Sequence, residues 1–437
     1  MSGRLYAYYG DDFTGSTDVL EVLASAGVRS VLYIGPPSGT RERGFSDCQA
    51  FGIAGDSRSR TPQWMGEHLP ALFARLGEFG APITHYKTCS TFDSSPWIGS
   101  IGRALEIGRD TLAGPVIPIV VAAPHLGRYV AFGNLFAAAA GVVYRIDRHP
   151  SMRAHPVTPM HEADLRRHLA AQTSMRIGLI ELPSLARNTA AEALAGGMAA
   201  GEAAVLFDGV SEADLAQTGR VLWRAAERHA LFCAGSSGLP YALLTPWREA
   251  GLIPARLDPP PRARPVDTLL VMSGSCSPVT ERQIHSALRA GYHGIALDAK
   301  ALLSEAHGLQ TGERLVQQAV SNLREGRSTI VYSALGPLGA GASASGEALG
   351  RCMGDLLARI LAEAPVPRVL LAGGDTSSHA VSRLGLYALT WLASLEPGAP
   401  LCRVHADTQT GLDGLELVLK GGQVGSEAFF ERVRLGR

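Results

Sequence analysis

The chain carries the stretch Leu371-Ala372-Gly373-Gly374-Asp375-Thr376-Ser377-Ser378-His379, and this stretch decides the fold prediction. The apolar run over residues 368–372 predicts a buried strand. After the glycines, Ala380, Val381 and Leu384 have the spacing of the inner face of a short helix. The segment is therefore predicted to run from a strand through a glycine turn into a helix.

Such a turn lets backbone N–H groups approach an anion closely, and the N-terminus of the helix adds its dipole. Gly373, Gly374 and the hydroxyl group of Thr376 therefore predict a phosphate cradle, with Asp375 beside it. No lysine follows the glycines as in a P-loop, and a third glycine at dinucleotide spacing is missing. From the pattern alone, a tight turn without any ligand remains an alternative.

Two further turns in the C-terminal part repeat this geometry. Ser273-Gly274-Ser275-Cys276-Ser277 follows a strand predicted over residues 268–272, and Lys420-Gly421-Gly422 follows one predicted over residues 417–419. Several such turns in one domain can surround one polyphosphate. Ser273, Ser275, Gly421 and Gly422 thus join the candidates for nucleotide binding, although a fold that simply needs tight turns explains the pattern as well.

Strand and helix patterns alternate along the whole chain, which predicts an α/β fold. The fold is predicted to have two domains, each a mainly parallel sheet flanked by helices, with the active site in the interdomain cleft. Residues 253–265 are rich in proline and are predicted to be a linker between domains over residues 1–252 and 266–437. The predicted strands cover residues 4–9, 28–34, 51–54, 84–88, 116–122, 176–182, 203–207 and 231–233, then 268–272, 294–297, 329–332 and 369–372.

The composition favours small-molecule partners. The formal net charge is +0 over 437 residues, without a long basic or acidic run, so neither nucleic acid nor an anionic membrane surface is an expected partner. No apolar run approaches the roughly 20 residues of a membrane span, and no signal sequence opens the chain, so a cytoplasmic location is expected. The 6 cysteines and 13 histidines lack metal-site spacing. A homo-oligomer is compatible with this composition.

Asp11 and Asp12 stand where the first predicted strand ends, at the edge where parallel sheets bind ligands. Carboxylates in this place can act as a general base or accept hydroxyl groups. The alternative is that Asp12 or Thr14 only caps the following helix.

Other polar residues follow predicted strands of the first domain. Arg58 can bind a carboxylate through two parallel hydrogen bonds, although a solvated loop explains it equally well. Residues 85–96 form the densest polar segment, and Arg128 lies in a loop after the strand predicted over residues 116–122. Together they predict a site for a hydroxylated anion, lined by Arg58, Lys87, Ser90, Thr91, Asp93 and Arg128.

With these residues the chain resembles the four-carbon acid sugar kinase family over essentially its whole length. The family's Asp-Asp-Phe-Thr-Gly motif matches residues 11–15, and its Gly-Ser-Cys-Ser turn matches residues 274–277. Its Gly-Gly-acid-Thr-Ser turn matches residues 373–377, and its late Lys-x-Gly segment matches residues 420–422. The resemblance implies a sugar-acid-binding N-terminal domain and a C-terminal domain that binds ATP.

The resemblance further implies an ATP-dependent kinase that phosphorylates the terminal (C4) hydroxyl of a short sugar acid. Asp12 would accept the hydroxyl proton and Asp11 would hold a substrate hydroxyl. Arg58 and Lys87 would bind the substrate carboxylate, while Ser90 and Thr91 would contact hydroxyls. The ATP contacts would be Ser275, Gly373, Gly374, Thr376, Gly421 and Gly422, with Asp375 orienting Mg²⁺.

One segment departs from the family pattern. Typical tetronate kinases carry Lys-x-Asp-Ser-Thr-Leu-Arg-Gly, whereas this chain has Cys89 and Asp93 in place of the aspartate and the arginine. This variant is similar to that of 3-oxo-isoapionate kinases, which favours 3-oxo-isoapionate or 3-oxo-tetronate as substrate, with D-threonate and D-erythronate as alternatives. A nicotinamide-dependent oxidoreductase and a nucleotide-regulated sugar-acid binding protein are alternatives of other classes.

Overall fold

The structure is a computed structural model, and it describes residues 3–37, 39–112, 114–139, 141–155, 157–256, 261–304, 306–335 and 346–437. The chain divides into two compact units, which are described one at a time below. Among the described residues, the first unit comprises residues 3–11, 22–30 and 42–256, and the second comprises residues 12–21, 31–41 and those from 261 onwards. Residues 257–260 of the predicted linker lie outside the described residues.

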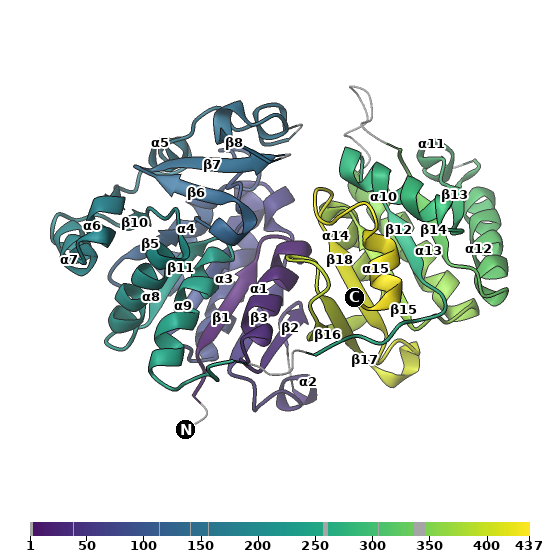
Figure 1. Cartoon of the computed structure of the whole chain (residues 1–437), viewed down its shortest axis with the longest axis horizontal. Coiled ribbons are helices and arrows are strands. Elements are labelled where there is room, and N and C mark those ends of the chain that lie inside the picture. The colour runs from purple at the N-terminus through teal and green to yellow at the C-terminus, as the bar shows by residue number, and fades with distance from the viewer. Residues whose placement is uncertain are drawn as a thin grey trace. The chain divides into compact units, whose positions relative to one another are not determined.

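The first unit is built on a parallel sheet with strand order β3-β1-β4-β11-β5-β10-β9. Its central strands β1, β4 and β11 are buried along their whole length, because helices cover both faces of the sheet (Figure 1). The strands are β1 (Tyr6–Gly10), β3 (Ala50–Ala54), β4 (Ile83–Lys87), β5 (Ile117–Val120), β9 (Ile177–Ile180), β10 (Ala204–Phe207) and β11 (Leu231–Gly235). The helices are α3 (Pro62–Glu78), α4 (Ile101–Thr111), α5 (Leu165–Ala170), α6 (Leu182–Ala186), α7 (Ala190–Ala199), α8 (Glu212–Ala226) and α9 (Gly238–Glu249).

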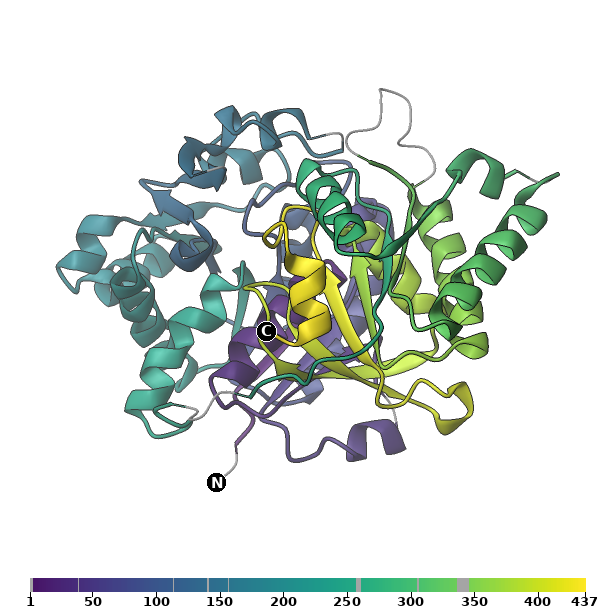
Figure 2. The same cartoon turned by 45° about the vertical axis from the view of Figure 1, so that its right-hand side comes forward.

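The second unit contains the sheet order β13-β14-β12-β15-β18-β17-β16-β2, parallel from β13 to β18 and antiparallel beyond. Helices α10 and α15 pack together on one face over an apolar cluster, as Figure 2 shows. The strands are β2 (Ser30–Ile34, from Val31), β12 (Leu270–Ser273), β13 (His293–Ala296), β14 (Thr329–Tyr332), β15 (Arg368–Ala372), β16 (Leu386–Ala393), β17 (Leu401–Ala406) and β18 (Glu416–Lys420). The helices are α10 (Pro278–Arg289), α11 (Ala299–Leu302), α12 (Gly308–Arg324), α13 (Gly346–Glu363), α14 (Gly374–Arg383) and α15 (Phe429–Leu435).

The predicted α/β class with two mainly parallel sheets is confirmed, and antiparallel parts extend it. Strands β16 and β17 were not predicted, and neither was a small separate sheet in the first unit. That sheet consists of β6 (Arg128–Ala131), β7 (Asn134–Ala139) and β8 (Val142–Arg145), so Arg128 begins a strand instead of lying in a loop.

Two helices cross the division between the units. Helix α1 (Phe13–Ser25) has its residues up to 21 in the second unit, and α2 (Thr40–Arg43) is divided after residue 41. Asp12 therefore groups with the C-terminal segments, whereas Asp11 groups with the first unit. The domain boundaries predicted at residues 252 and 266 stay a prediction.

Candidate active site

Three turns lie at the carboxyl edge of the parallel sheet in the second unit. Strands β12, β15 and β18 are neighbours, and their last residues are in register, Ser273 with Ala372 and Ala372 with Lys420. The turns after these strands, residues 274–277, 373–377 and 421–422, therefore start at one edge of the sheet. This edge is where open parallel sheets bind ligands.

The Gly373 turn connects β15 directly to α14. Gly373 has a φ of 114°, a value that side chains disfavour, and its N–H donates to the carbonyl of Lys420 at 2.9 Å. A Cβ atom placed on Gly374 would have no neighbour closer than Thr14 Oγ1 at 3.9 Å, so packing alone does not require glycine there. The helix begins without a side-chain cap, which leaves its first N–H groups for other partners. The side chains of Asp375 and Thr376 lie outside the described part of the structure.

The other two turns are joined by Thr280 on α10. Its Oγ1 atom lies 3.0 Å from Ser275 Oγ and 3.0 Å from the carbonyl oxygen of Gly422, and it accepts a hydrogen bond from Lys420 Nζ at 2.9 Å. A Cβ atom on Gly422 would come within 2.8 Å of Ser275 Oγ, so this approach requires glycine. Burial lowers the pKa of Lys420 to about 7.

Two buried hydroxyl groups at this edge have no hydrogen-bond partner among the described residues. They belong to Ser273, the last residue of β12, and to Ser377 in the first turn of α14, and both side chains are fully buried. Buried hydroxyl groups are normally hydrogen-bonded, so these two are candidates to contact a ligand.

The Asp12 turn lies against the start of α14 in the same unit. The amide of Phe13 is 3.5 Å from Ser378 Oγ, and the amide of Gly15 donates to Asp12 Oδ1 at 2.5 Å. Asp12 therefore does cap α1, as the alternative interpretation proposed. The cap occupies one carboxylate oxygen, and Thr14 Oγ1 lies 3.3 Å from the other.

In the first unit, Asp11 directly follows β1, and Lys87 is the last residue of the neighbouring strand β4. The amide of Asp11 donates to the carbonyl of Lys87 at 2.9 Å, and the amide of Arg58 donates to the carbonyl of Asp11 at 3.1 Å. Both side chains are buried, Asp11 with 4% and Lys87 with 2% exposure. A cation and an anion are thus present at the carboxyl edge of this sheet, where the sequence predicted the substrate site.

Asp93 is the centre of a hydrogen-bond network in the first unit. Arg58 Nη2 donates to it at 2.7 Å, Thr91 Oγ1 at 2.5 Å and Thr158 Oγ1 at 2.9 Å. Burial alone favours the protonated acid, but Arg58, the hydroxyl of Thr91 and the charge of His155 outweigh it, and the pKa of Asp93 falls to about 2. Arg58 is therefore engaged by a carboxylate of the chain itself.

Cys89, Ser90 and Arg128 belong to the same part of the first unit. Thr91 Oγ1 lies 3.0 Å from Cys89 Sγ, and Ser90 is half-buried in the same turn. Arg128 Nη1 donates to the carbonyls of Leu126 at 2.9 Å and Ala138 at 3.3 Å, while its buried Nε has no partner among the described residues. Burial lowers the pKa of Arg128, and the nearby thiol of Cys89 opposes this shift.

Sequence reasoning did not assign Thr158 or Thr280. Thr158 lies three residues after His155, and its contact with Asp93 spans 65 positions of sequence. Thr280 is a polar residue on the buried face of an amphipathic helix. A polar residue at such a position is the sequence signal that could have marked it as a candidate site residue.

The described residues contain no cluster of three or more histidine, cysteine, aspartate or glutamate side chains suited to a metal ion. Among the helices of the described residues, none is both long and apolar enough to cross a membrane.

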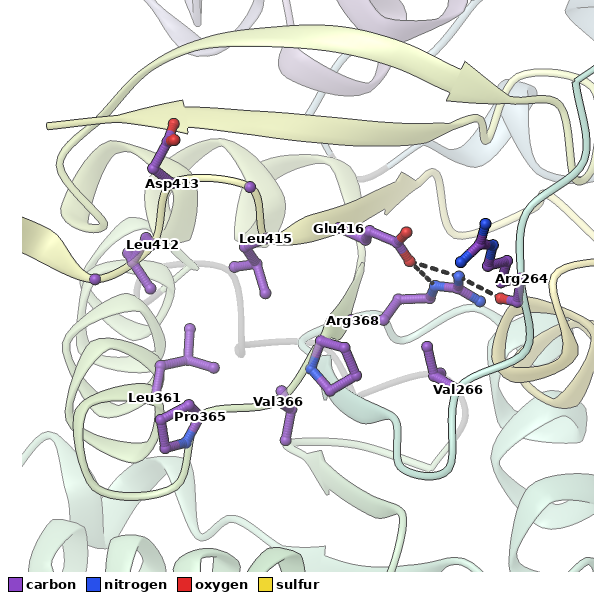
Figure 3. A pocket seen from close by; sticks show the side chains of 13 residues that line it. Arg264, Val266, Leu361, Pro365, Val366, Arg368, Leu412, Asp413, Leu415 and Glu416 are labelled. Atoms are coloured by element: carbon purple, nitrogen blue, oxygen red, sulfur yellow. Dashed lines mark hydrogen bonds and ion pairs between the residues drawn. The ribbon is translucent and has the colours of Figure 1, made fainter. Parts of the chain in front are cut away.

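A pocket of about 340 Å³ lies at the opposite, amino edge of the second unit's sheet (Figure 3). Arg368 and Glu416, the first residues of β15 and β18, stand in its wall beside apolar residues such as Leu361 and Val366. The three glycine turns follow the other ends of these strands, so this pocket is not the predicted phosphate cradle.

Comparisons with known proteins agree with this division of chemistry. The model of a sugar-binding N-terminal domain matches residues 6–243, and the model of a nucleotide-binding C-terminal domain matches residues 270–430. A 3-oxo-isoapionate kinase of Paraburkholderia graminis is 46% identical over 100% of this chain and 95% of its own length. A 3-oxo-tetronate kinase of Pseudomonas fluorescens is 32% identical over 97% of this chain and 94% of its own length.

Solved structures show the same fold. A Salmonella typhimurium LT2 protein, described as a tRNA synthase, superposes with a TM-score of 0.77 at 27% identity and covers 98% of both chains. Haemophilus influenzae protein HI1011 superposes with a TM-score of 0.70 at 26% identity, covering 98% of this chain and 99% of its own.

Proposed function

We propose that this chain, which belongs to the four-carbon acid sugar kinase family, transfers the γ-phosphoryl group of MgATP to a short 3-oxo sugar acid. The acceptor is the terminal (C4) hydroxyl, and the substrate is 3-oxo-isoapionate or 3-oxo-tetronate. The observation that carries the proposal is the identity of 46% with a 3-oxo-isoapionate kinase over the whole chain. As an enzyme that uses ATP, it would act in the cytoplasm.

The glycine turns of the second unit support nucleotide binding. The start of α14 has no side-chain cap and can offer N–H groups to a phosphate, and Gly374 has no Cβ atom to obstruct its approach. Ser273, Ser275, Gly421 and Gly422 follow the neighbouring strands at the same edge. Mg²⁺ enters with ATP as part of the substrate, and Asp375 would orient it.

The network around Asp93 supports a 3-oxo sugar acid as substrate. Where the tetronate kinase motif has an arginine, this chain has a carboxylate that forms an ion pair with Arg58 and accepts hydrogen bonds from Thr91 and Thr158. Lys87 and Arg128 are then the cations left to bind the substrate carboxylate, and Ser90 with Asp11 would contact hydroxyl groups. Arg128 suits this role because its buried Nε still has a donor to satisfy.

In the proposed reaction the C4 oxygen attacks the γ-phosphorus in line, and the bond from that phosphorus to the β–γ bridging oxygen breaks. ADP leaves, and the hydroxyl proton passes to Asp12. The position of the Asp12 turn against the start of α14 supports this role, because the base then belongs to the unit that binds the phosphates. Alignment and charge neutralisation supply most of the rate enhancement in phosphoryl transfer.

The test is ADP release from MgATP with 3-oxo-isoapionate, 3-oxo-tetronate, D-threonate and D-erythronate as acceptors. We expect turnover with one of the 3-oxo acids, with kcat/KM at least tenfold above either tetronate. Preference for a tetronate would overturn the substrate assignment. Binding of ATP and a sugar acid without turnover would instead identify a nucleotide-regulated binding protein.

Replacing the proposed base tests the mechanism. Asp12→Asn retains the amide oxygen that caps α1, so the fold should persist, while kcat should fall by about 10²- to 10⁴-fold. The KM for ATP should change little, and the melting temperature serves as the folding control. Full turnover by this variant would remove Asp12 from the role of base.

A further inference from the structure

Lysine is rare in this chain, and its positions are informative. The sequence contains 40 lysines and arginines, of which 3 are lysines, at positions 87, 300 and 420. Lys300 on α11 is exposed, whereas Lys420 has 0% exposure at the end of β18. A fully buried ammonium group is costly unless an anion or several acceptors compensate its charge.

The described residues provide little compensation for Lys420. Its Nζ donates to Thr280 Oγ1 at 2.9 Å, and no carboxylate of the described residues forms an ion pair with it. An ammonium group has three donors, so one neutral hydroxyl leaves most of its capacity unused. An external anion would balance this charge and accept the remaining donors.

The surroundings of Lys420 match a polyphosphate. Its carbonyl accepts from the Gly373 amide, and through Thr280 its side chain connects to Ser275 and to the Gly422 carbonyl. Lys420 is thus linked to all three turns at this edge of the sheet, directly or through Thr280. The unpartnered buried hydroxyls of Ser273 and Ser377, at the ends of the same turns, are a second, independent sign of a polar ligand.

We propose that Lys420 supplies the positive charge that holds the nucleotide phosphates, in the place of the lysine that a P-loop carries after its glycines. This inference rests on the proposed function and goes beyond it, because it assigns the charge of the cradle to a side chain on a different strand. The ammonium group lies at the base of the cradle. Thr280, which contacts both Lys420 and Ser275, orients the Ser275 hydroxyl group toward the phosphates. Low dielectric in this buried location strengthens the attraction to phosphate.

Affinities for nucleotides of different charge test the proposal. Isothermal titration calorimetry would compare ATP, ADP, AMP and adenosine on the wild type, Lys420→Met and the matched control Lys300→Met. For Lys420→Met we expect losses of at least about tenfold for ATP and ADP, and less than about twofold for adenosine. Equal losses for all four ligands, or no loss, would overturn it. Lys300→Met should bind like the wild type.

A second measurement uses the intact protein and does not depend on the variant folding. Selective ¹⁵N labelling of lysine gives three Nζ signals, and Lys300→Met and Lys87→Met assign two of them, so the third belongs to Lys420. The Lys420 signal should shift on addition of ADP and stay in place with adenosine. An unchanged Lys420 signal at saturating ADP would refute the inference.

Removing the Thr280 hydroxyl group, which links Lys420 to Ser275, should have a smaller effect on nucleotide affinity. Thr280→Val should weaken ADP binding by about three- to tenfold, whereas Thr280→Ser should retain the wild-type affinity. Equal affinities for the two variants would contradict the role of Thr280. If the wild type binds ATP but phosphorylates no sugar acid, the proposed function fails while the role of Lys420 stands.

Discussion

The two ends of the strand pair β15 and β18 each bury one cation, and the two cations differ in what surrounds them. At the amino end Arg368, with 0% exposure, donates to Glu416 at 2.7 Å and to the carbonyl of Arg264 at 2.8 Å. Carbonyls of Val433 and Arg434 accept from the same guanidinium. At the carboxyl end Lys420 is equally buried, and among the described residues it donates to a single hydroxyl group.

This contrast separates a structural charge from a functional one. Arg368 has its charge balanced and its donors occupied, and it connects β15 to α15 and to the segment before β12. Arg368 lines the pocket of Figure 3, but Glu416 already neutralises its charge there. Lys420 has one hydrogen-bond acceptor among the described residues, and this deficit is why we propose it as the functional charge.

The largest effect on stability is expected at Arg368. Arg368→Met should lower the free energy of unfolding by about 3–5 kcal/mol, because it leaves the Glu416 carboxylate without its ion-pair partner and removes one donor from each of three carbonyl groups. Urea denaturation measures the change. A loss below about 1 kcal/mol would show that the amino-end cation is not structural and would break the comparison.

The next effect concerns the pH dependence of stability. The pKa of Lys420 is about 7 in the folded protein against 10.5 as its ordinary value, so between these values the unfolded chain binds more protons. Stability should therefore rise with pH across this window, by at most about 1.4 kcal/mol per pH unit from this group. Below the folded pKa the full penalty applies.

Lys420→Met should remove this contribution, and the difference between the two urea curves at several pH values isolates it from other titrating groups. Identical pH profiles for the variant and the wild type would contradict a buried, uncompensated ammonium group.

The pair Arg58 and Asp93 in the first unit provides an intermediate case, since Asp93 has 0% and Arg58 25% side-chain exposure. Asp93→Asn should cost about 2 kcal/mol, because Arg58 loses its counter-charge but keeps contact with solvent. The contribution of Asp93 is present above its ordinary pKa of 3.8 and is lost as the pH falls through about 2. Urea midpoints at neutral pH test the variant, and a cost near zero would show that the network lacks net stability.

The smallest effect is expected for an exposed pair. Arg282 lies 3.5 Å from Glu427, with 54% and 62% side-chain exposure. Arg282→Met should change the free energy of unfolding by less than about 0.5 kcal/mol, because water screens the charges. A loss as large as that of Arg368→Met would show that burial does not explain the ranking.

The sequence by itself determined the local pattern of this protein. The strand predicted over residues 368–372 matches β15 residue for residue, and the glycine turn and helix after it follow as predicted. Apolar runs and turn residues are local signals, and they act through neighbours in the chain. The same local motifs were sufficient to predict the family and the kinase class, and the 3-oxo sugar acid stays a prediction.

Only the tertiary structure decided which distant residues meet. No local pattern indicated that β16 and β17 pair in antiparallel orientation. Asp12 groups with the C-terminal segments although it follows the first strand in the sequence. Thr158 reaches Asp93 across 65 positions, and Lys420 reaches Thr280 across 140. Such contacts depend on how strands are ordered in a sheet, which is set by the packing of the whole core and not by any one segment.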